Sequence, residues 1–187
     1  MNFINACKEG NLELVLDLIS EWNINYEWCG NNTPLMYAIR GGHTRIALTL
    51  ISKGARPNCK NQHGDTALSL ACWFSYTEIA QALISNGADL DYNSEICKNT
   101  YLMDASKGGR IKIAQVLISN GANLDSRNIF HKTAFDMALN DKVKDVFRAW
   151  KRTPRSLKFT MLQTKLPFNI PKPLLTYKSF DSETTTF

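Results

Sequence analysis

The sequence predicts an all-α solenoid of about five helix–turn–helix units, and three observations lead to that fold class. Apolar residues recur at fixed distances from a repeated threonine, and a Gly-Ala pair closes three of the repeats, at residues 54–55, 87–88 and 121–122. The repeated threonines lie 33 or 34 residues apart, at Thr33, Thr66, Thr100 and Thr133. Self-similarity with such a period is typical of repeat proteins in which each unit packs against its neighbours.

Each threonine is expected to begin the first helix of a unit. A Thr side chain can accept a hydrogen bond from a backbone N–H of the first turn, and Pro34 suits the first helical position because no donor is needed there. A large apolar residue and an alanine follow two and five residues later, at Leu35, Leu68, Leu102 and Phe135, and at Ala38, Ala71, Ala105 and Ala138. Because residues three apart share a helix face, we expect both positions to be buried, with alanine where the second helix crosses closely.

The second helix of each unit is predicted from an I-A-x-x-L-I pattern at residues 46–51, 79–84 and 113–118. This spacing places four apolar residues on one stripe of a helix. The glycine that follows supplies the left-handed backbone conformation that commonly ends a helix. Polar stretches such as residues 56–65 are then the turns that lead to the next unit.

Three short motifs carry a resemblance to a known family. Thr-Pro-Leu-Met-Tyr-Ala at residues 33–38, Gly42-His43, and Gly-Ala-Asp-Leu-Asp at residues 87–91 resemble the T-P-L-H-x-A, G-H and G-A-D-V-N signatures of ankyrin repeats. The resemblance covers about the first four-fifths of the chain and implies an ankyrin-repeat solenoid with short turn or hairpin fingers. The first and last units depart from the pattern and resemble caps. The expected units are approximately residues 1–28, 29–58, 59–91, 92–125 and 126–150.

The resemblance also implies where a partner protein binds, which is the concave side formed by the turn tips and the first helices. Register along the repeat places two rows of candidate contact residues there. The helix row contains Arg40, Trp73 and Lys107, with Phe74 next to Trp73, and the turn-tip row contains Asn32, Asp65, Asn99 and Lys132. The sequence thus predicts a protein–protein interaction module, an adaptor or scaffold, without naming the partner.

Trp73 and Phe74 stand out because the family usually has small or polar residues at these positions. Tryptophan is common at binding hot spots, and Arg40 and Lys107 on either side suit a partner segment with an acidic residue near an apolar one. The alternative is that one of the aromatic pair packs with Tyr76 against a neighbouring turn, and that the two cations are merely solvated.

No pattern in the sequence indicates catalysis or a cofactor. The three histidines and five cysteines lack zinc-ligand spacing, and no phosphate-binding loop, nucleophile elbow or paired-carboxylate motif is present. We therefore expect no enzyme activity, no metal and no small-molecule substrate. The odd number of cysteines, without C-x-x-C spacing, and the absence of a secretory signal favour reduced thiols and a cytoplasmic location.

Residues 151–187 are predicted to form a separate basic tail. The chain has a net charge of +5, and the tail holds all of that excess, with seven bases and two acids. Its four prolines exclude a long helix, although the alternation of Leu157, Phe159 and Met161 would allow one strand. An alternative function is therefore a regulatory subunit that contacts nucleic acid or anionic membrane through this tail, which we disfavour because its basic run is short. Thr185-Thr186-Phe187 also resembles a ligand for PDZ domains.

Overall fold

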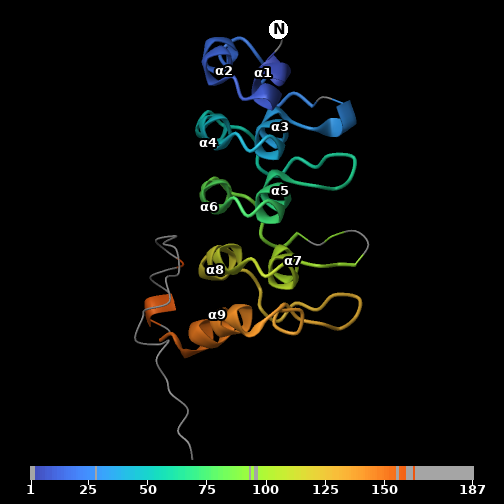
Figure 1. Ribbon diagram of the computed structural model, residues 1–187, viewed down its shortest axis with the longest axis vertical. Coiled ribbons are helices and arrows are strands. Elements are labelled where there is room, and N and C mark those ends of the chain that lie inside the picture. The colour runs from blue at the N-terminus through green and yellow to red at the C-terminus, as the bar shows by residue number, and fades with distance from the viewer. Residues whose placement is uncertain are drawn as a thin grey trace, which may run out of the picture.

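The computed structural model describes residues 3–27, 29–92, 94, 97–154, 156–158 and 162. Within these residues, helices form in pairs that stack one above the next (Figure 1). The pairs are α1 (Phe3–Glu9) with α2 (Leu12–Leu18), α3 (Pro34–Arg40) with α4 (Thr44–Ser52), α5 (Ala67–Trp73) with α6 (Thr77–Ser85), and α7 (Tyr101–Lys107) with α8 (Ile111–Ser119). A short 3-10 turn, η1 (Cys29–Asn31), precedes α3, and α9 (Asp141–Arg152) ends the stack.

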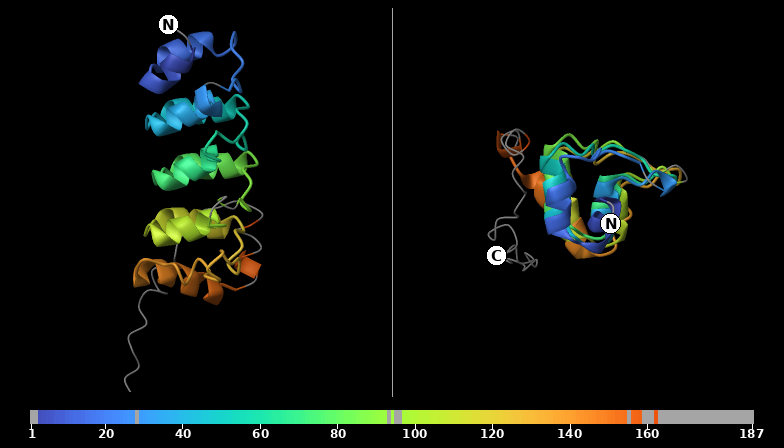
Figure 2. Two further views of the ribbon diagram at one scale, coloured as in Figure 1. Left: turned by 90° about the vertical axis from the view of Figure 1, so that its right-hand side faces the viewer. Right: turned by 90° about the horizontal axis from the view of Figure 1, so that it is seen from above.

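The units are arranged in two columns of helices with hairpins on one side. First helices lie above first helices and second helices above second helices, and the hairpins project together from the first-helix column (Figures 1 and 2). We call these hairpins finger 2 (residues 29–32), finger 3 (residues 61–65), finger 4 (residues 94 and 97–99) and finger 5 (residues 128–132). The inner face is the side between the fingers and the first helices. This arrangement confirms the predicted all-α ankyrin-repeat solenoid.

The threonine caps form as predicted. Thr33, Thr66 and Thr100 have extended backbone conformations, and each side chain accepts a hydrogen bond from the backbone N–H three residues later, over 3.1–3.3 Å. Thr133 makes the same contact with Asp136 N over 3.3 Å. Each cap satisfies one of the free N–H groups at a helix or turn start, which fixes where the second to fifth units begin.

The predicted core positions are buried in the three central units. Ala38, Ala71 and Ala105 are at most 1% exposed, and the preceding leucines of the motif are equally inaccessible. The apolar stripes of α4, α6 and α8 pack against the first helices and against one another along the stack. The fifth unit differs, because Phe135 is 36% exposed and Ala138 is only half-buried.

The fifth unit also lacks the first α-helix that the repeat predicts. Residues 134–137 form a turn, after which Leu139 N donates to Ser106 O of the fourth unit. Asn140 then caps α9, which continues through Arg152, two residues beyond the expected boundary at residue 150. Because Leu139 bonds to the neighbouring unit at this point, its N–H is not available to extend a helix. The division into a repeat domain and a tail stays a prediction.

Little of the tail is described. Residues 156–158 have helical geometry, in place of the strand that alternation had allowed, while Phe159, Met161 and the C-terminal Thr185-Thr186-Phe187 lie outside the described residues. Across the described part of the chain, none of the helices combines the length and the apolar character that a membrane span requires.

Candidate functional site

A groove opens on the inner face between the third and fourth units. It has a volume of about 760 Å³ and lies between fingers 3 and 4, above the C-terminal half of α5 and the neighbouring part of α7. Leu70, Cys72 and Ala105 contribute apolar surface, and Trp73 and Phe74 contribute the large aromatic side chains. Charged groups border it on both sides, so the groove can hold an apolar group whose flanks are polar.

Trp73 is exposed in this groove but held in place. Its side chain is 66% exposed, and the Arg110 guanidinium carbon lies 5.1 Å from the ring centroid. Arg110 is itself fixed, because its Nε donates to Trp73 O over 3.1 Å and its Nη1 donates to Asp104 O over 3.3 Å. A cation over an indole face is attractive, so Arg110 restricts the orientation of the ring while leaving most of it accessible.

Arg110 was not among the residues predicted for the site, although the repeat contained a signal. Arg110 and His43 occupy the same repeat position, ten residues after Thr100 and Thr33. His43 Nε2 lies 3.0 Å from Lys8 O in the preceding unit. Lys8 and Trp73 also occupy equivalent positions, so the residue at this register reaches back to the preceding first helix in both cases. Gly108 makes the reach possible, since a Cβ there would collide with the Arg110 guanidinium.

Phe74 has the packing role that the sequence left open. Its ring stacks on Tyr76 with centroids 5.7 Å apart, and it remains 41% exposed at the edge of the groove. Phe74 therefore both packs and offers surface to the groove.

The cation next to Trp73 along the predicted row is already paired. Arg40 Nη2 lies 3.1 Å from Asp65 Oδ2, and both side chains are about two-fifths exposed. Lys107 and Lys132 are exposed and form no ion pair with another described residue. Of the predicted row, then, Lys107 remains a free cation, while Arg110 replaces Arg40 as the cation at the Trp73 ring.

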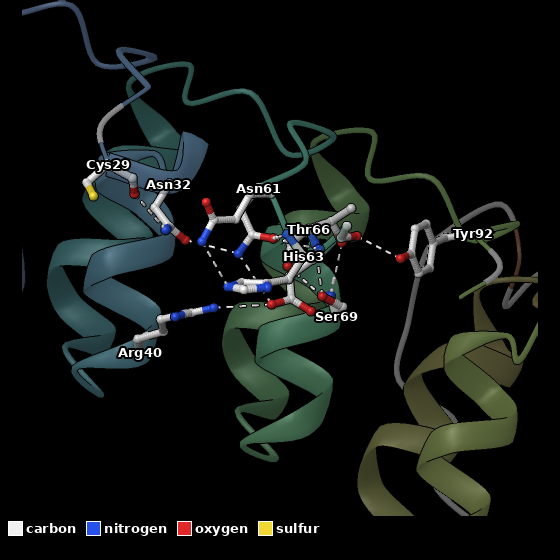
Figure 3. Close-up of polar contacts among 11 residues, drawn as sticks. Cys29, Asn32, Arg40, Asn61, His63, Thr66, Ser69 and Tyr92 are labelled. Carbon is white, nitrogen blue, oxygen red and sulfur yellow. Dashed lines mark hydrogen bonds and ion pairs between the residues drawn. The ribbon is translucent and has the colours of Figure 1, made fainter. Parts of the chain in front are cut away.

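Two residues of the predicted turn-tip row form hydrogen bonds between neighbouring units. Asn32 Oδ1 accepts a hydrogen bond from Asn61 Nδ2 over 3.1 Å, and Asn99 Oδ1 accepts one from Asn128 Nδ2 over 2.9 Å. Figure 3 shows the amide of Asn61 pointing at Asn32 across the gap between fingers 2 and 3. Asn32 and Asn99 are buried as a result. A binding role for them stays a prediction, and the proposal below does not depend on it.

The gap between fingers 3 and 4 is joined differently. Ser94 takes the place of the bridging asparagine, since Asn99 N donates to its Oγ just as Asp65 N donates to Asn61 Oδ1. Two tyrosines connect the units instead: Tyr92 OH donates to Gly64 O, and Tyr101 OH lies 2.7 Å from Thr66 Oγ1. Tyr92 reaches toward finger 3 in Figure 3. The groove therefore opens where, among the described residues, no side-chain amide links the fingers.

Two buried cysteines, Cys72 at the groove and Cys7 in the first unit, are not activated nucleophiles. Burial raises the pKa of the Cys72 thiol to about 12, and the same cause raises that of Cys7 to about 12. A thiol with such a pKa stays protonated at neutral pH, so both residues act as small apolar groups. All five cysteines are unpaired. Across the described residues, no group of three or more His, Cys, Asp or Glu side chains is placed to hold a metal ion.

Comparisons with known proteins identify the repeat. The family model for ankyrin repeats in three copies matches residues 3–94, and the model for a single ankyrin repeat matches residues 97–129. Among curated relatives, the ankyrin repeat and KH domain-containing protein mask-1 of Caenorhabditis elegans is 42% identical over 88 residues, which are 46% of this chain and 3% of that protein.

Two further relatives are a cation channel homolog and a bacterial ankyrin repeat protein. A transient receptor potential cation channel subfamily A member 1 homolog of C. elegans is 34% identical over 122 residues, covering 65% of this chain and 10% of the channel. The putative ankyrin repeat protein YahD of Escherichia coli is 37% identical over 90 residues, covering 44% of this chain and 45% of YahD. The chain spans less than half the length of each of these relatives, so the likeness concerns the repeats. The chain belongs to the ankyrin-repeat family, whose repeats are in general non-catalytic protein–protein interaction modules.

Proposed function

We propose that this chain is an adaptor that binds a partner protein in the groove between fingers 3 and 4, with Trp73 as the main anchor. The observation that supports this most is the combination of exposure and restraint at Trp73: 66% of the side chain is accessible, yet Arg110 holds the ring. An anchor that is already ordered loses less conformational entropy on binding, and buried tryptophans dominate many interfaces.

The surroundings of Trp73 indicate the chemistry of the partner segment. Leu70 and Ala105 give the groove apolar surface, which suits an apolar side chain of the partner. Arg110 has N–H groups beyond the two bonded to carbonyls, and Lys107 lies on the same helix row. A carboxylate beside the apolar residue would satisfy these cations. The cytoplasmic location is part of the same proposal and is supported by the five unpaired cysteines.

The test uses the full chain as bait, with bound proteins quantified over a range of bait concentrations. Trp73→Ala should weaken binding more than thirtyfold, since truncating such an anchor costs at least ~2 kcal/mol, at ~1.4 kcal/mol per decade. Leu16→Ala is a matched control, because Leu16 is 50% exposed but lies on α2, away from the inner face. Helical circular dichroism should be unchanged in both variants.

Two results would contradict the proposal. If Trp73→Ala and Leu16→Ala bind the same proteins with unchanged affinity, the groove is not the binding surface. If binding survives Trp73→Ala but weakens steeply with salt, the contact is electrostatic and belongs to the basic tail, which is the alternative function.

A further inference from the structure

The tip of finger 5 carries an exposed apolar pair that lies outside the groove. Ile129 and Phe130 are adjacent in the chain, and their side chains are 53% and 62% exposed. The fingers project beyond the first-helix column (Figures 1 and 2), and Ile129 and Phe130 form the turn of finger 5. Adjacent large apolar side chains on a surface commonly mark an interaction site.

Finger 3 is a natural control for this tip, because its backbone is bonded in the same way. Asn61 N and Asn128 N each donate to the carbonyl four residues later, over 3.0 and 3.1 Å. Asn61 Oδ1 accepts from His63 N, and Asn128 Oδ1 accepts from Phe130 N, over 2.9 and 3.0 Å. The equivalent tips therefore differ in side chains alone, with Gln62 and His63 where finger 5 has Ile129 and Phe130. The fold does not require apolar residues at this position.

Basic residues surround the apolar pair. Residues 127–132 include Arg127 and Lys132 and no acid, whereas the equivalent residues 60–65 of finger 3 include one base and one acid. Arg127 Nη1 donates to His131 O, which closes the turn below the tip. Ile129 N donates to Cys97 O of finger 4, which brings the next residue, Lys98, close to the tip of finger 5. Lys98 is exposed.

One acid partly offsets this charge. Asp136 accepts hydrogen bonds from Thr133 N and Oγ1, over 2.9 and 2.8 Å, at the base of finger 5. These bonds lower the pKa of Asp136, and the charges of Arg127 and Lys132 add a smaller effect in the same direction. Arg127, Lys132 and Lys98 thus lie on or beside finger 5, and Asp136 at its base is already hydrogen-bonded.

The shape and charge together favour a lipid surface over a protein. Two side chains on a convex tip bury far less than the roughly 800 Å² per partner of a stable protein interface. A bilayer interface can deform around a small apolar tip, and anionic headgroups attract bases at its rim. We propose that finger 5 inserts Ile129 and Phe130 into the interface of a membrane that contains anionic lipid, with Arg127, Lys132 and Lys98 at headgroup level. The groove stays open, because it lies between fingers 3 and 4.

The experiment is vesicle flotation with the full chain. Vesicles of phosphatidylcholine alone are compared with vesicles of phosphatidylcholine and phosphatidylserine. The chain should float with the second kind only, and added salt should weaken the association. Ile129→Gln/Phe130→His, which gives finger 5 the tip of finger 3, should reduce the apparent affinity roughly tenfold or more, since two apolar side chains no longer insert. The melting temperature should not change, because both side chains are exposed.

Two controls separate the tip from other contacts. Lys132→Gln should weaken the association severalfold, because it removes a rim charge. Gln62→Ile/His63→Phe, introduced together with the finger 5 double substitution, should restore little binding, since finger 3 has Asp65 where finger 5 has Lys132.

Three results would overturn the inference. The first is equal flotation of the wild type and the finger 5 variant. The second is binding that disappears with Lys151→Gln/Arg152→Gln and not with the tip variant, which would assign it to the tail. The third is a tip variant that floats normally but loses a protein captured through Trp73, which would make the tip part of the protein interface. The first two results leave the groove test unaffected.

Discussion

The joint between the second and third units and the joint between the third and fourth units use different chemistry. In the first, the Asn61 amide bridges to Asn32, and Arg40 pairs with Asp65 on the inner face. In the second, the hydroxyls of Tyr92 and Tyr101 bond to the third unit. We call them the amide joint and the tyrosine joint.

The two joints also differ in what lies beside them, because the groove opens at the tyrosine joint. The amide bridge links fingers 2 and 3 directly, from Asn61 to Asn32. The tyrosine bonds reach Gly64 in finger 3 and Thr66 at the start of α5, and the groove lies beside them between fingers 3 and 4. Arg110 borders this space by reaching back across the tyrosine joint to Trp73. The tyrosine joint thus combines hydrogen bonds between the units with the exposed surface of the groove.

The largest expected loss of stability follows from a substitution in the amide joint. Asn61→Ala removes the bond to Asn32 and leaves the backbone N–H groups of His63 and Asp65 without their acceptor. Because partly buried donors are left unpaired, we expect a loss of about 2–3 kcal/mol in the free energy of unfolding. Urea denaturation followed by circular dichroism measures it. A loss below that of Tyr101→Phe would show that the amide joint is not the stronger one.

Overpacking of the core between the two joints should lower the stability of the chain by nearly as much. Ala71 lies in α5, which packs against α3 and α7 between the two joints, and it is fully buried. Ala71→Leu should destabilise the chain by about 1–3 kcal/mol through overpacking, measured by thermal unfolding. Ala138→Leu is the matched control at the same repeat position, and it should cost less because Ala138 is only half-buried in the irregular fifth unit. Equal melting temperatures for both variants and the wild type would argue against the repeat register.

A smaller effect is expected at the tyrosine joint. Tyr101→Phe removes one hydroxyl bond, while Thr66 Oγ1 still accepts a bond from Ser69 N. We expect a loss of about 1 kcal/mol, typical of one hydrogen bond whose partner retains another. Tyr37→Phe is the control, since its hydroxyl bonds within its own unit, to Cys29 O. Binding at the groove should respond to Tyr101→Phe and not to Tyr37→Phe, which partner titration can decide.

The smallest effect concerns acid titration of the exposed Asp136, away from both joints. Its hydrogen bonds to Thr133 hold its pKa below the ordinary value of 3.8. A carboxyl whose pKa is lowered by folding stabilises the chain above its unfolded pKa, and this contribution is lost as the pH falls through the folded pKa. Asp136→Asn should therefore flatten the dependence of stability on pH below about pH 4. Identical acid-unfolding curves for the variant and the wild type would contradict this role.

The sequence determined the units of this protein through local rules. A threonine cap, an alanine at the helix crossing and a glycine exit each act within a few residues, so periodicity revealed them. The same register selected Trp73, which lines the groove, and Lys107, which is exposed. It missed the fifth unit's lost helix, which depends on the bond from Leu139 N to Ser106 O.

Tertiary structure decided which of these surface residues are available. The side chains of Asn32 and Asn99 each accept a hydrogen bond from an asparagine amide 29 positions later in the chain. Arg110 donates to the carbonyl of Trp73, 37 positions earlier. Contacts at such separations depend on how one unit sits on the next, which local periodicity does not encode. The exposed tip at Ile129 and Phe130 emerged for the same reason, because only the folded finger shows that two apolar residues of an ordinary turn sequence lack a neighbour to bury them.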